Sequence, residues 1–211
     1  MRTQTFISSM VGVVAAAAVA GSVNAATVID NFATSFGPGY STIQSGAGIL
    51  GERTTTNGTI YGTGILTFTN PGIKWQGDAW MTSSLEYGNF GGNYETLDLT
   101  NALLTMNGSG SGTGTAFLKV TLYDNSYKRA RWEVAFSSSI NMSTSNFSSV
   151  AAGFNLDKIF AITVETGDLD YSSTVNYTMT NFSYSSVSVP APGAAALIGL
   201  AGIVAGRRRR N

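Results

Sequence analysis

The sequence has no cysteine and no histidine among its 211 residues. The lack of cysteine excludes disulfides, cysteine-ligated metals and thiol nucleophiles. The lack of histidine excludes His-containing catalytic triads and His-ligated zinc. Charged residues are few, at 11% of the chain, and proline is present only 4 times. Any chemistry must therefore come from carboxylates, hydroxyls, aromatic rings, lysine or arginine.

The formal net charge of zero is the sum of unlike parts of the chain. Residues 27–188 hold 12 acidic and 7 basic side chains, a net charge of −5, and the remaining arginines lie in the terminal segments. Nucleic-acid binding requires clustered lysine and arginine, so we expect no nucleic-acid partner. The hydrophobic content of 43% indicates a folded chain. A body of about 160 residues buries roughly 70% of its unfolded surface and needs no disulfide.

The N-terminal segment, MRTQTFISSMVGVVAAAAVAGSVNA, has the layout of a secretory signal peptide. Arg2 precedes an apolar stretch from Phe6 to Ala20, and small residues occupy the positions before Ala25. This pattern predicts a signal helix within residues 1–25, recognised by the export machinery and cleaved after Ala25. The alternative is an N-terminal helix of the protein core.

The C-terminal segment, VPAPGAAALIGLAGIVAGRRRRN, combines an apolar run of 14 residues, Gly193 to Gly206, with a basic end. As a helix this run would span about 21 Å at ~1.5 Å per residue, against ~30 Å for the hydrocarbon core of a bilayer. Four arginines behind it are typical of a cytoplasmic stop. We therefore predict a short apolar helix that anchors the chain transiently in the inner membrane. The alternative is a permanent anchor.

This tail resembles the PEP-CTERM sorting signal of Gram-negative, exopolysaccharide-producing bacteria. The residues that carry the resemblance are Val189, Pro190, Ala191 and Pro192, followed by the apolar run and by Arg207, Arg208, Arg209 and Arg210. Ala191 stands where that family usually has Glu. The resemblance implies processing of residues 189–211 by an exosortase-like enzyme, and a mature protein at the cell surface or in the extracellular matrix, including biofilm matrix.

Residues 26–188 show short β-rich runs, separated by Gly, Asn and Ser at spacings of roughly 10 to 14 residues. This pattern is typical of an all-β sandwich or barrel. We predict one β-sandwich domain, with a short helix or turn near 148–155. Its expected strands are Thr27–Thr34, Thr42–Leu50, Thr59–Thr69, Ile73–Trp80, Glu95–Thr100, Ala102–Asn107, Ala116–Tyr123, Arg129–Ser137, Lys158–Glu165 and Val175–Tyr184.

The stretch AFLKVTLYDNSYKRARWEVAF predicts a hairpin with a defined register. Side chains alternate between the two faces of a sheet, and both apolar sets must face one core. A three-residue loop, residues 125–127, satisfies this condition and sets Leu122 opposite Ala130 and Lys119 opposite Glu133. A five-residue loop results if the strand ends fray.

The terminal strands carry two further predictions. The apolar positions of the last strand change phase between Met179 and Phe182, which predicts a bulge near Thr180. The runs TVIDNFAT and NYTMTNFSYSS loosely resemble the opening and closing strands of jelly-roll carbohydrate-binding domains. The resemblance implies that these two strands lie side by side.

Two groups of residues are candidates for carbohydrate binding. Rings that stack on sugars and polar groups that fix hydroxyls make such sites. The first group lies in residues 75–95, where the alternative is a tryptophan packed in the core beside a Gly-rich loop. The second is the polar face of the hairpin, where Arg suits a uronate carboxylate and the alternative is a solvated sheet face. The candidates are Trp75, Trp80, Tyr87 and Tyr94 in the first group and Lys119, Tyr123, Arg129 and Arg131 in the second.

No motif brings two carboxylates together as a glycosidase requires, so we expect no catalytic residues and no catalytic cofactor. Asp30, Asp168 and Asp170 offer oxygen ligands of the kind Ca²⁺ prefers, but the sequence has no EF-hand-like loop. We expect no metal site, with a structural Ca²⁺ as the alternative.

The sequence as a whole predicts an exported, non-catalytic protein of the cell surface or matrix that associates with extracellular polysaccharide. Two alternatives belong to other classes. One is a secreted glycoside hydrolase or polysaccharide lyase with a jelly-roll core. The other is a purely structural matrix protein.

Overall fold

The computed structural model describes residues 25–36, 41–57, 65–70, 72–78, 83–88, 90, 95–166 and 173–186. These residues belong to one compact unit, Val23–Ser188. The predicted signal helix and the C-terminal apolar helix lie outside the described residues. Within the described residues, no helix is long enough and apolar enough to cross a membrane.

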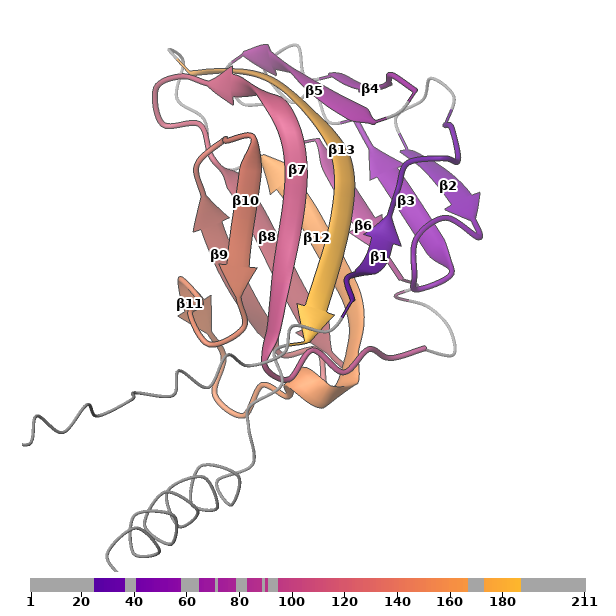
Figure 1. The fold of residues 1–211 in the computed structure, drawn as a ribbon, viewed down its shortest axis with the longest axis vertical. Helices are drawn as coiled ribbons and strands as arrows, with labels where there is room; N and C mark the ends of the chain where they lie inside the picture. Colours follow the sequence, from indigo (N-terminus) through magenta and orange to yellow (C-terminus); the bar gives the residue numbers. More distant parts are fainter. Residues whose placement is uncertain are drawn as a thin grey trace, which may run out of the picture. The chain divides into compact units, whose positions relative to one another are not determined.

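The described residues form two antiparallel sheets, which confirms the predicted all-β sandwich (Figure 1). The six-stranded sheet has the order β10-β7-β13-β5-β4, with β1 also paired to β13, and the seven-stranded sheet has the order β11-β9-β8-β12-β6-β3-β2. Figure 1 shows the long strands β7 and β13 side by side, with β8 and β12 behind them. The first sheet contains β1 (Thr27–Asp30), β4 (Ile65–Phe68), β5 (Ile73–Asp78), β7 (Ala102–Gly112), β10 (Ser139–Ser143) and β13 (Thr174–Ser186). The second contains β2 (Ser41–Ser45), β3 (Glu52–Thr56), β6 (Ser84–Tyr87), β8 (Leu118–Asp124), β9 (Arg129–Val134), β11 (Ser149–Val150) and β12 (Ile159–Thr166).

The hairpin of β8 and β9 has the predicted register. Leu122 pairs with Ala130, and Lys119 pairs with Glu133. The N–H of Asp124 donates to the carbonyl of Lys128 at 2.9 Å, so the loop has three residues, 125–127. Tyr127 takes a left-handed conformation, with φ of 58°. The alternation of apolar residues was sufficient to fix this register because one face is buried along the whole hairpin.

The first and last strands, β1 and β13, also agree with the sequence predictions in their pairing and in the bulge of β13. The ladder between β13 and β7 shifts register between Met179 and Asn181, which confirms the predicted bulge. Strand β1 pairs with β13, with Thr27 opposite Tyr184. β1 ends at Asp30, four residues earlier than predicted, because the Asp30 carboxylate accepts the N–H of Phe32 at 2.7 Å and turns the chain.

Several predicted boundaries are wrong. Residues 95–100 form no strand and contribute one isolated bridge, between Leu97 and Ile159. Strands β3, β6, β10 and β11 were not anticipated. β3 reads ERTTT and turns Arg53 and Thr55 inward, so its buried face is polar and gives no apolar alternation. Part of the predicted 148–155 turn is β11, and a 3₁₀ helix, η1 (Leu156–Lys158), follows it.

The core lies between the two sheets and contains large side chains from both. The rings of Tyr87 on β6 and Phe182 on β13 meet with their centroids 5.9 Å apart. A buried ion pair, Arg53 on β3 with Asp30 on β1, also joins the sheets, with a nitrogen-to-oxygen distance of 2.6 Å. Gly108 on β7 has no room for a side chain, because a Cβ there would overlap the hydroxyl of Tyr177.

Candidate functional site

Two residues of the first predicted group of sugar-binding residues, Trp75 and Tyr87, do not lie on the surface. The side chains of Trp75 and Tyr87 are fully buried, with 0% exposure, so neither ring face can stack on a sugar. Both residues lie on strands whose alternation turns them into the core. The burial of Trp75 is the alternative weighed for this stretch, whereas that of Tyr87 was not anticipated. Trp80 and Tyr94 lie outside the described residues.

The second predicted group does share one surface. Leu122 and Ala130 face the core, so Tyr123, Arg129 and Arg131 point to the outer face of the seven-stranded sheet. Tyr123 lies directly opposite Arg129 in the ladder. Lys119 lies on the same face, opposite Glu133 and further along the ladder from Arg129 than Arg131 is. We call this surface the hairpin face.

The cations of the hairpin face differ in their partners. The guanidinium of Arg131 lies 3.3 Å from the carboxylate of Glu133, and the ammonium of Lys119 lies 3.4 Å from that of Glu165. Arg129 is exposed, and no described residue forms a salt bridge with it. Arg129 can therefore take an anionic ligand without first losing an ion pair.

Sequence reasoning named Tyr123 but missed that its ring belongs to a row of four aromatic rings that borders the hairpin face. The centroid of Phe90 lies 5.3 Å from that of Tyr123 and 5.3 Å from that of Phe160, and Tyr127 lies 5.2 Å from Phe160. All three contacts are edge-to-face, the arrangement that the ring quadrupole favours. Phe160 is buried, whereas Phe90 is 38% and Tyr127 56% exposed. We call these four residues the aromatic row.

The aromatic row joins three segments that are far apart in the sequence, and a tight backbone contact holds two of them together. Gly88 has φ of 94°, and a Cβ at this position would overlap the carbonyl oxygen of Phe160. Its N–H donates to the carbonyl of Glu52 at 3.0 Å. The segment that carries Phe90 therefore lies directly against β12. In the sequence, the only signal for this was a glycine beside two aromatic residues, YGNF.

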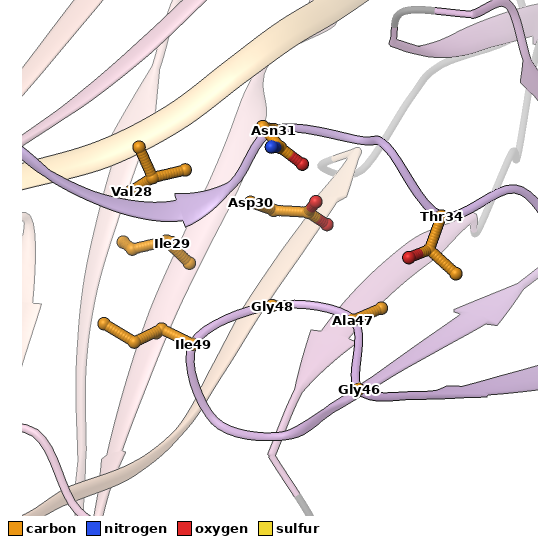
Figure 2. Close-up of a pocket in the computed structure, with 9 residues that line it drawn as sticks. All are labelled: Val28, Ile29, Asp30, Asn31, Thr34, Gly46, Ala47, Gly48 and Ile49. Carbon is orange, nitrogen blue, oxygen red and sulfur yellow. The ribbon is translucent and has the colours of Figure 1, made fainter.

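A separate cavity of about 220 Å³ lies between the end of β1 and the loop 46–49. Figure 2 shows the carboxylate of Asp30 in the space between this loop and Thr34. None of the described residues that line it is aromatic. The carboxylate is already held by Arg53 and by the N–H of Phe32. Among the residues that the structure describes, the cavity therefore offers no ring for stacking on a sugar.

The same contacts bear on the calcium alternative. Arg53 is fully buried and donates to Asp30, to the side-chain oxygen of Gln44 at 2.9 Å and to the carbonyl of Thr34. A guanidinium thus takes the oxygen ligands around Asp30 that a cation would use. No group of three acidic side chains that could hold a metal exists within the described residues. Asp168 and Asp170 lie outside them.

One pair of carboxylates lies on the outer face of the seven-stranded sheet, which also carries the hairpin face. Glu86 on β6 and Glu165 on β12 are on neighbouring strands, with Glu86 opposite Thr163 and Glu165 opposite Ser84. Burial raises the pKa of Glu86, and the negative charge of Glu165 raises it further, while a hydrogen bond from Ser84 opposes both. Neither carboxylate lines the cavity beside Asp30.

Comparison with known proteins shows similarity in structure only. No protein-family model and no curated protein sequence matches the chain. An agarase is similar with a TM-score of 0.50 and 9% identity; the match covers 79% of this chain and 25% of the agarase. A family 11 carbohydrate-binding module of a cellulosomal cellulase from Clostridium thermocellum is similar with a TM-score of 0.43 and 10% identity, over 80% of this chain and 98% of the module. This chain thus matches about a quarter of the agarase, and at such identity the likeness shows the fold alone.

Proposed function

We propose that this chain is an exported, non-catalytic protein whose β-sandwich associates with extracellular polysaccharide at the hairpin face and the aromatic row. By their names, the agarase and the carbohydrate-binding module act on or bind polysaccharide. The proposal for this chain is based on its own surface.

The observation that carries the proposal is the combination of exposed rings with an uncommitted arginine. Tyr127 and Phe90 are exposed although aromatic side chains are large and apolar, and Arg129 lies on the adjoining outer face. Sugar sites combine apolar area for the pyranose ring with a few polar groups for its substituents. Both elements are present here without any rearrangement of the backbone.

The terminal segments supply the second part of the proposal. A signal peptide cleaved after Ala25 would export the chain. A tail processed after about Pro192 would release it from the inner membrane to the surface or matrix. The exosortase-like enzyme implied by the resemblance of the tail would carry out this second step.

A depletion assay tests the proposal. The full chain, kept in mild detergent, is mixed with insoluble neutral and acidic polysaccharides, and the protein left in solution is measured. We expect at least one polysaccharide to deplete the parent protein from solution. Tyr127→Asn should no longer be depleted, whereas Lys74→Gln, whose lysine lies on the other sheet, should be depleted as the parent is. A chain that no polysaccharide retains would refute the proposal.

The carboxylate pair Glu86 and Glu165 is the one observation that favours an enzyme instead. A raised pKa on one acid beside a second carboxylate is the arrangement that glycoside hydrolysis uses. The assay above therefore includes measurement of reducing ends and unsaturated uronates in the supernatant. Their release by the parent chain, and not by Glu86→Gln, would establish the hydrolase or lyase alternative.

A further inference from the structure

The proposed function does not say whether the polysaccharide is acidic or neutral. The charges of the hairpin indicate which of the two it is. The body from residue 27 to 188 is acidic, yet the hairpin 118–134 has four basic and two acidic residues. One of these acids, Asp124, is buried. The segment 118–134 is thus more basic than the domain as a whole, and a local excess of positive charge favours an anionic partner over a neutral one.

The loop that carries Tyr127 is held rigid from inside. Asp124 accepts hydrogen bonds from the N–H groups of Ser126 and Lys128, both at 2.9 Å, through one oxygen. Its other oxygen accepts the N–H of Asn155 at 2.9 Å. The buried carboxylate thus ties the loop to the segment before η1, and the exposed side chains of the loop are positioned before any ligand arrives.

Tyr127 occupies a position that disfavours it. Its φ of 58° lies in the left-handed region, where glycine or asparagine is preferred in hairpin loops. Phe32 has a similar φ of 57°, but its ring is fully buried in the core. Tyr127 is 56% exposed, so burial explains only part of its presence. Strained residues are concentrated at binding sites, which makes Tyr127 a candidate contact residue.

Arg129 completes the arrangement. It lies opposite Tyr123, the ring at one end of the aromatic row, and Tyr127 at the other end of the row is two residues away in the chain. A guanidinium pairs with a carboxylate through two parallel hydrogen bonds, which a hydroxyl or an ester cannot accept with the same strength. Arg131 and Lys119 are already paired with Glu133 and Glu165, so Arg129 is the best placed of these three cations for a ligand.

We propose that the hairpin face and the aromatic row bind an acidic polysaccharide, with a uronate carboxylate on Arg129 and a pyranose ring against Tyr127 and Phe90. This inference rests on the proposed function and adds the charge of the ligand. A neutral glycan would use only the rings.

Polyuronates and their esters distinguish binding of an acidic polysaccharide from binding of a neutral one. The full chain in mild detergent is titrated with polygalacturonate, alginate and hyaluronate, each beside its alkyl ester, which keeps the sugars and removes the charge. We expect at least one acid form to bind about tenfold more tightly than its ester, a difference of about 1.4 kcal/mol. Raising the salt concentration should weaken binding to the acid form and leave binding to the ester nearly unchanged.

Variants locate the effect. Arg129→Gln should remove the preference for the acid form, and the matched control Lys74→Gln should keep it. Tyr127→Asn should weaken binding to both forms, whereas Tyr127→Phe should not. The thermal midpoint of Tyr127→Asn should stay within about 3 °C of the parent, because Asn tolerates the left-handed position. Equal binding of acid and ester, or an unchanged preference in Arg129→Gln, would overturn the inference while the proposed function stands. Binding of neither form, together with no retention by neutral polysaccharides, would overturn both.

Discussion

Replacement of Arg53 by methionine should destabilise the sandwich more than any change on its surface. Arg53 is fully buried, and its guanidinium donates to Asp30, Gln44 and the carbonyl of Thr34. The central carbon of its guanidinium also lies 5.8 Å from the ring centroid of Phe32 and 5.9 Å from that of Phe36. Methionine has a similar length but leaves the buried carboxylate of Asp30 without its partner.

The size of the effect follows from that unpaired charge. Removal of one partner of a buried ion pair typically costs about 3–5 kcal/mol. In a domain of 150–250 residues each kcal/mol lowers the melting temperature by roughly 2–4 °C. We therefore expect Arg53→Met to lower the melting temperature by about 6–20 °C, measured by circular dichroism at pH 7. Because Asp30 and Arg53 lie on different sheets, the loss weakens the attachment of one sheet to the other.

A double-mutant cycle isolates the pair from the rest of the network. Asp30→Asn removes the negative charge, so the double variant Asp30→Asn/Arg53→Met should be less destabilised than the sum of the single variants, by about 0.5–3 kcal/mol. Arg129→Met serves as the matched control, because this arginine is exposed and its loss should change stability by less than about 0.5 kcal/mol. If Arg53→Met were no worse than Arg129→Met, or the cycle were additive, the reasoning would be refuted.

Four further predictions concern other parts of the chain. Burial raises the pKa of Tyr87 well above 10.0, so its contribution to stability should be complete below about pH 10 and lost as the pH rises further. Tyr87→Phe should therefore lose less stability than the parent between pH 10 and 11.5 in urea titrations, and an equal loss would contradict this cause. At pH 7, Tyr87→Phe should be nearly neutral because the hydroxyl forms no hydrogen bond with any described residue, whereas Tyr177→Phe should cost about 1 kcal/mol because it loses a bond to a backbone carbonyl. Gly88→Ala should destabilise by more than about 1 kcal/mol through strain and overlap with the Phe160 carbonyl, and a neutral result in the same urea titration would show that this contact can relax. Mass spectrometry of protein recovered outside the cell should find no residues beyond about Pro192, and an intact arginine cluster would count against the proposed sorting tail.

The elements best predicted from the sequence were those with continuous alternation. The hairpin register followed from apolar residues at every second position of both strands, and the bulge of β13 followed from the change of phase after Met179. The missed strands gave a weaker signal, since β10 alternates over only five residues, with Ile140 and Met142 buried. β6 is only four residues long and is set in a Gly-rich stretch, and β3 turns a buried arginine inward.

The candidate site was only partly predictable for the same reason. Tyr123, Arg129 and Arg131 belong to one hairpin, so local alternation placed them on one face. Trp75 and Tyr87 were candidates for a sugar site because aromatic residues among glycines suit one, but their strands turn them inward. No local rule distinguishes these two outcomes when the partner strand is unknown.

The sequence by itself determined that this is a β-sandwich and how the central hairpin pairs, because these properties depend on neighbours in the chain. Only the tertiary structure decided that Phe90, Phe160 and Tyr127 meet, and that Arg53 reaches Asp30 across the two sheets. Contacts between distant segments depend on strand order and on the packing of one sheet against the other. Side-chain periodicity along a single strand contains no information about either.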